Sequence, residues 1–78
     1  MRNYSSDERT FARQFGISPA GLRTLMRGAA NGGRVVGDGM GFEAAGGRVG
    51  LRARGLADIE VLTQAGLDLA ARIRAAGF

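Results

Sequence analysis

Several residue types that carry much of protein chemistry are missing from this sequence. Its 78 residues contain no cysteine, no histidine and no tryptophan, and all 11 basic side chains are arginines, so there is no lysine. Without cysteine there is no disulfide framework and no thiolate metal site. The usual general bases, thiol nucleophiles and Schiff-base amines are absent as well.

These absences predict a protein that binds a partner and is not an enzyme. Seven carboxylates, one tyrosine and a few hydroxyls remain for catalysis. Asp58 and Glu60 share one face of a predicted strand and could form an acid–base pair or a metal site. A solvated face paired with Arg48 or Arg52 is the far commoner arrangement. We therefore expect no catalytic residue, no cofactor and no metal.

The length predicts a single domain over residues 1–78. A domain of this size buries only about 60% of the surface that its unfolded chain exposes, so its stability margin is small. No apolar run approaches the length of a membrane span, and residues 1–7 contain no apolar stretch typical of a secretion signal. We expect a cytoplasmic protein with no membrane partner.

Charge is the main compositional feature. Eleven arginines against seven acidic residues give a net charge of +4. Because guanidinium groups match phosphate geometry, this excess favours a nucleic-acid partner. A GC-rich coding sequence, which is rich in arginine, alanine and glycine codons, would produce the same composition.

Two helices are predicted within residues 5–31, because the residues that bound them are present. These are the capping pair Ser5 and Glu8, the C-cap Gly16, the N-cap Ser18, Pro19 at the first helical position, and the closing run 31–33. A third helix is predicted over residues 63–77. Thr63 caps it, and its expected buried stripe is Ala65, Leu69, Ala70, Ile73 and Ala76.

Between these helices, residues 34–62 are predicted to form a small antiparallel β-hairpin or sheet. Residues 34–44 read as a hairpin around the tight turn Gly37-Asp38-Gly39. Residues 48–54 alternate with period two, which favours a strand over a helical turn. They are expected to pair with residues 58–62, placing Arg52 near a carboxylate of that segment. The fold class expected is α+β.

Residues 11–25 carry a recognisable pattern. Ala12 stands where two helices would touch, and Gly16 stands where the turn between them needs a positive φ. The apolar positions around them are Phe11, Phe15, Ile17, Leu22 and Leu25. This pattern resembles the bacterial helix-turn-helix family of DNA-binding segments, as found in small bacteriophage and prophage proteins. The resemblance implies that the second helix lies in the major groove.

The later part of the chain resembles winged helix-turn-helix proteins. Residues 34–44 lie where such proteins keep their wing, and the Gly-Leu pair at 55–56 and the Leu-Thr-x-x-Gly run at 62–66 recur in them. The interval between these two motifs is too short for a wing of its own. The resemblance therefore implies a degenerate or rearranged variant.

The resemblance also implies which residues contact the partner. They are Ser18, Ala20, Arg23, Thr24, Arg27 and Arg34. Replacing Arg23 and Arg27 is expected to leave folding nearly intact, because both should face outward. A homodimer is expected through the alanine-rich last helix, with Leu69, Ile73 and Phe78 at its interface.

Two functions from different classes are consistent with these features. The first is a small non-catalytic DNA-binding regulator of phage or mobile-element type. The alternative is a phage-encoded inhibitor that binds a host nucleic-acid-processing complex. For this alternative the chain resembles bacteriophage anti-CRISPR proteins in its size and composition.

Overall fold

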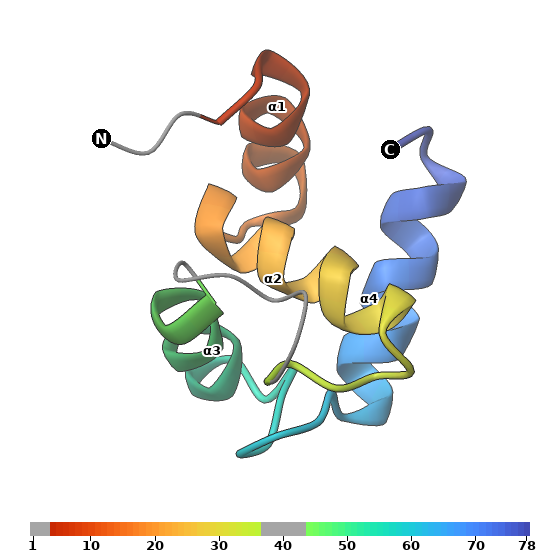
Figure 1. Cartoon of the computed structure of the whole chain (residues 1–78). Coiled ribbons are helices and arrows are strands. Elements are labelled where there is room, and N and C mark those ends of the chain that lie inside the picture. Colours follow the sequence, from red (N-terminus) through yellow and green to blue (C-terminus); the bar gives the residue numbers. More distant parts are fainter. Residues whose placement is uncertain (1–3, 37–43) are drawn as a thin grey trace.

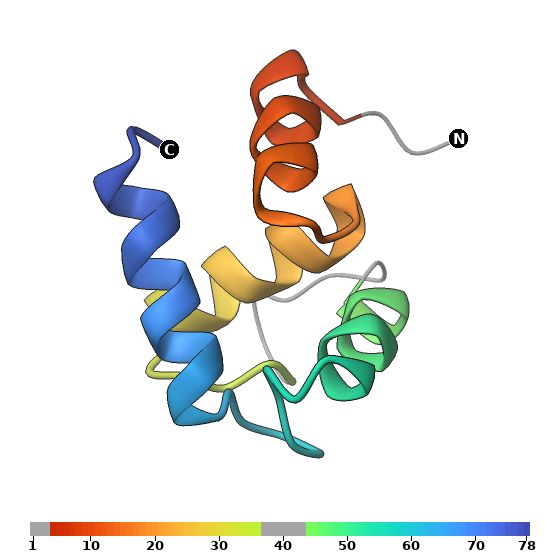
Figure 2. The ribbon, with the colours of Figure 1, turned by 180° about the vertical axis from the view of Figure 1, so that it is seen from behind.

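The computed structural model describes residues 4–36 and 44–78, which form a bundle of four helices (Figure 1). The helices are α1 (Ser6–Phe15), α2 (Pro19–Ala30), α3 (Ala44–Ala53) and α4 (Gln64–Ala75). α2 runs through the middle of the molecule and packs against the other three, as both views show (Figures 1 and 2). None of the helices in these ranges is long and apolar enough to cross a membrane.

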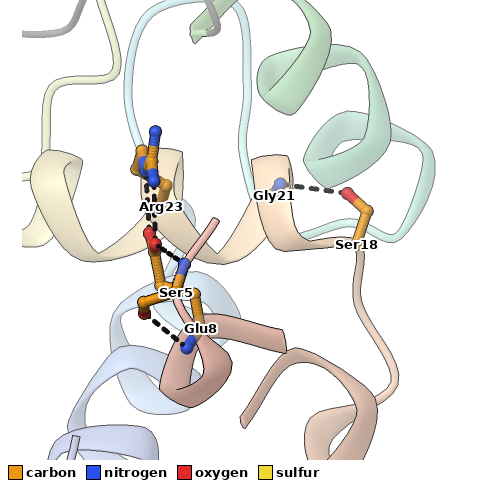
Figure 3. Close-up of polar contacts among 5 residues, drawn as sticks. All are labelled: Ser5, Glu8, Ser18, Gly21 and Arg23. Atoms are coloured by element: carbon orange, nitrogen blue, oxygen red, sulfur yellow. Dashed lines mark hydrogen bonds and ion pairs between the residues drawn. The ribbon is translucent and has the colours of Figure 1, made fainter. Parts of the chain in front are cut away.

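The predicted boundaries of α1 and α2 are confirmed. The Ser5 hydroxyl accepts a hydrogen bond from the Glu8 amide at 3.1 Å, and the Glu8 carboxylate accepts one from the Ser5 amide at 2.8 Å. Gly16 ends α1 in the left-handed conformation, with a φ of 72°. Ser18 caps α2 by accepting a hydrogen bond from the Gly21 amide at 3.0 Å (Figure 3).

The core is built around α2. The largest fully buried side chains come from α2, α3, α4 and the segment after α2, and they are Leu22, Thr24, Leu25, Val35, Leu51 and Ile73. Since α2 contributes three of these six, the helix expected to lie against a partner is the one most enclosed by its own chain.

The expected α+β fold is wrong. The described residues contain four helices and no strand, and residues 44–53, which include most of the predicted strand 48–54, form α3. Packing explains the difference, because Leu51 is 1% exposed in the core while Val49 is 70% exposed. A strand would have placed these two side chains on one face. The predicted pairing with residues 58–62 is therefore not formed.

In the described residues of the remaining predicted β region, only isolated bridges are formed. One joins Arg34 to Val61, and the other lies within residues 56–63. The Asp58 amide donates to the Val61 carbonyl at 2.7 Å and closes a tight turn. We call residues 58–61 the acidic turn. The predicted Gly37-Asp38-Gly39 hairpin falls outside the described residues.

The last helix is confirmed, and its predicted buried stripe is confirmed only in part. Thr63 caps α4 by accepting a hydrogen bond from the Gly66 amide at 3.2 Å. Of the predicted stripe, Ala70 and Ile73 are buried and Leu69 is half-buried, whereas Ala65 and Ala76 are exposed. The Leu56 carbonyl lies so close to Gly66 that a β-carbon there would collide with it. Gly66 therefore makes part of the α4 contact that was expected of alanines. Hydrophobic periodicity could not identify it, because glycine has no apolar side chain.

Candidate nucleic-acid interface

The residues expected to contact a partner from α2 do not form one open surface. Ser18 is exposed and caps the helix, whereas Ala20 is half-buried. Thr24 is 1% exposed, and its hydroxyl has no hydrogen-bond partner among the residues that the structure describes. The expected outward orientation of Thr24 is therefore wrong, because α3 packs over this side of α2 and places Gly47 against the threonine.

Arg23 is engaged within the protein. Its Nε–H donates to Glu8 Oε2 at 2.7 Å, and its Nη2 donates to Glu8 Oε1 at 2.8 Å (Figure 3). Its guanidinium also lies over the Tyr4 ring, 4.4 Å from the centroid. Such a bidentate pair fixes both side chains. The expected outward orientation of Arg23 is wrong, since its guanidinium pairs α2 with Glu8 of α1. Its replacement is now expected to weaken the contact between the two helices.

This pair controls the protonation of Glu8. The hydrogen bonds from Arg23 lower the pKa of the Glu8 carboxyl from 4.5 to about 2, and they outweigh the opposing effect of burial. The Ser5 amide and hydroxyl lower the same pKa further. The folded chain therefore favours the ionised form of Glu8 over its protonated form.

Glu8→Gln should lower the free energy of unfolding by about 1–2 kcal/mol at neutral pH, because it removes the charged acceptor of a bidentate pair. The folded-state pKa of Glu8 lies below the unfolded one, so this stabilisation is present above pH 4.5 and is lost as the pH falls towards about 2. Urea titrations of both proteins at pH 7 and near pH 2 check this. The exposed Asp7→Asn is the control, and an equal loss in that variant would contradict the assignment.

The other predicted contact residues are exposed but separate from these. Arg27 is exposed on α2, and Arg34 is exposed in the segment that follows it. Of the predicted dimer residues, Ile73 is completely buried within its own chain. Phe78 packs edge-to-face on Phe11, with ring centroids 5.2 Å apart, and Leu69 is half-buried. Much of the predicted dimer interface is thus already packed within the chain, and little of it remains exposed for contact with a second copy.

A basic surface that the motif analysis missed lies on α3 and on the turn that follows it, which contains Arg54. Arg52 and Arg54 are exposed and Arg48 is half-buried, and residues 44–57 contain no acidic residue. Val49 of the same helix is 70% exposed. We call Arg48, Val49, Arg52 and Arg54 the α3 face. The sequence signal was present as an acid-free run containing three arginines.

The α3 face is open because α3 packs against α2 through its opposite side. Gly47 makes the closest approach, and a β-carbon there would lie 2.8 Å from the Ala20 carbonyl oxygen. Leu51, one turn later, enters the core. Gly46 and Gly50 would meet no atom of the described residues within 4 Å if they carried a β-carbon. In the part of the chain that the structure describes, no cluster of three acidic side chains could hold a metal ion.

Comparisons with protein-family models, with curated proteins and with solved structures found no match. The resemblance to helix-turn-helix proteins therefore rests on the residues of this chain. The charge and shape of the chain's own surface are what point to its function.

Proposed function

We propose that the protein is a small non-catalytic DNA-binding regulator and that α3, not α2, makes the main DNA contact. The observation that carries this proposal is the acid-free α3 face, with Arg52 and Arg54 exposed and paired with no carboxylate among the described residues. Arginine is the residue that binds phosphate and guanine by two hydrogen bonds. α2, enclosed by the other three helices, presents no comparable surface.

The dimensions of α3 suit a DNA groove. A helix of 10 residues is about 15 Å long, and the major groove, about 12 Å wide, admits a helix lengthwise. Arg48 and Arg52 lie one turn apart on the same side of α3. These features support close contact with a polyanion.

Replacing Arg52 and Arg54 together with alanine should weaken binding to duplex DNA about tenfold at low salt. If both contact phosphates, the slope of log affinity against log salt should also fall by about two units. Folding should be unchanged, because both side chains are exposed. Fluorescence anisotropy with labelled duplexes of several sequences at two salt concentrations measures the affinity and the slope.

The matched control is Arg9→Ala with Arg74→Ala, which removes the same charge from exposed positions on α1 and α4. Equal losses of affinity in the two double variants would show a non-specific charge effect and would contradict the assignment to α3. If the wild-type protein binds no duplex at either salt concentration, the DNA-binding proposal is wrong. That result would favour the alternative, an inhibitor that acts through protein contacts.

A further inference from the structure

The α3 face and the acidic turn carry opposite charges side by side. The acidic turn exposes Asp58 and Glu60 and contains no arginine. Both views place it beside the C-terminal end of α3 (Figures 1 and 2). Yet no salt bridge joins either carboxylate to Arg52 or Arg54 within the chain. Each charge set is therefore available to a second molecule.

The α3 face and the acidic turn also carry the most accessible large apolar side chains among the described residues. Val49 on α3 is 70% exposed, and Ile59 and Val61 in the acidic turn are 65% and 46% exposed. Exposed apolar side chains that cluster, with charges around them, are typical of protein–protein contact surfaces. A bare phosphate backbone would leave this apolar area without a partner.

We propose that two copies of this chain pair through the α3 face and the acidic turn about a two-fold axis. In such a pairing the same surface meets itself, so a contact from one copy to the other is made twice. Arg52 and Arg54 of each copy then lie against the two carboxylates of the other, and the three apolar side chains are buried between them. A surface that carries both signs of charge is complementary to a second copy of itself.

The pairing would also regulate DNA binding, and this part rests on the function proposed above. Because Arg52 and Arg54 lie inside the pair, a paired molecule cannot present them to phosphate. DNA and the second copy then compete for one surface, and DNA binding separates the two copies. A specific interface of about 1,000 Å² in total needs roughly 500 Å² from each copy. That is a small part of the chain's 4691 Å² of accessible surface.

Sedimentation equilibrium of the full chain at tens of micromolar tests the pairing. We expect dimers at about 0.01 M salt and weaker association at about 1 M, where screening is strong. Asp58→Asn with Glu60→Gln should raise the dimer dissociation constant about tenfold at low salt. Asn at position 58 can still accept the hydrogen bond that Asp58 takes from the Ile59 amide, so the turn should be kept. Asp7→Asn with Asp68→Asn changes the net charge equally and should alter the constant less than about twofold.

A charge exchange gives the sharpest test. One variant carries Asp58→Arg and Glu60→Arg, and the other carries Arg52→Glu and Arg54→Glu. Each should be monomeric alone, because its pairing surface has one sign of charge. An equimolar mixture should form a heterodimer, since opposite charges then meet at both halves of the interface. Association of both variants rules out misfolding as the cause of their monomeric state.

The outcomes separate this inference from the proposed function. A wild-type chain that stays monomeric at both salt concentrations overturns the pairing, whatever its affinity for DNA. A dimer that is insensitive to the carboxylate replacements, or a mixture that fails to associate, overturns the interface. Dimers that respond as expected while no duplex binds overturn only the DNA function and its regulation. A duplex that binds intact dimers overturns the competition.

Discussion

Gly47→Ala should remove a large share of the protein's free energy of unfolding and lower its melting temperature by roughly 10–20 °C. A β-carbon at position 47 would collide with the Thr24 side chain and lie 2.8 Å from the Ala20 carbonyl oxygen. A side chain can rotate away, but the carbonyl belongs to the backbone of α2 and cannot move without displacing the central helix. Overpacking of this kind costs up to about 3 kcal/mol, a large share of the stability of about 5 kcal/mol expected for so small a domain.

The matched control is Gly50→Ala, three positions along the same helix. A β-carbon at Gly50 would meet nothing within 4 Å, and its φ is not in the left-handed region. Alanine there should stabilise the chain by about 0.5–1 kcal/mol, because glycine loses more backbone entropy inside a helix. Thermal unfolding followed by circular dichroism compares the two variants. Similar melting temperatures would mean that α3 does not approach α2 at Gly47.

Helix ends were the most predictable part of the fold, because capping is local chemistry. Ser5, Ser18 and Thr63 each accept a hydrogen bond from a backbone amide three residues later. Gly16 has the positive φ that its position suggested. In each case the partners lie within one or two turns of the cap, so a short stretch of sequence contains the whole interaction.

The fold class could not be predicted in the same way, because the residues that place α3 are remote in sequence from their partners. Period-two alternation over residues 48–54 favoured a strand, and the three glycines of α3 weakened the helical pattern. What decides the helix is the contact of Gly47 and Leu51 with α2. A glycine contributes to that contact by having no side chain, which no hydrophobic pattern records.

The candidate site was misplaced for a related reason. On two helices alone, Arg23 and Thr24 would face outward from α2. In the folded chain Glu8 reaches across from α1 to hold Arg23, and α3 covers Thr24. The acid-free run of arginines on α3 could have been read from composition. Its exposure could not, because it depends on which side of α3 packs against α2.

Leu51→Ala should destabilise the protein by about 3 kcal/mol, within the usual 2–5 kcal/mol for a fully buried leucine. Val49→Ala should cost almost nothing and could add a few tenths of a kcal/mol, because Val49 is exposed and alanine is the better helix former. Urea titrations at high salt, where paired copies are separated, measure both values. A strand over residues 48–54 would place both side chains on one face, so equal losses would contradict α3.

Val49→Ala also separates the folding of α3 from its use. If the α3 face meets a second copy, this variant should keep wild-type stability at high salt and still raise the dimer dissociation constant several-fold at low salt, because it removes exposed apolar surface that pairing buries. Leu51→Ala should instead lower the free energy of unfolding as its main effect, since the Leu51 side chain lies in the core. If Val49→Ala weakens association without lowering stability, and Leu51→Ala lowers stability first, then one side of α3 serves pairing and the other serves folding.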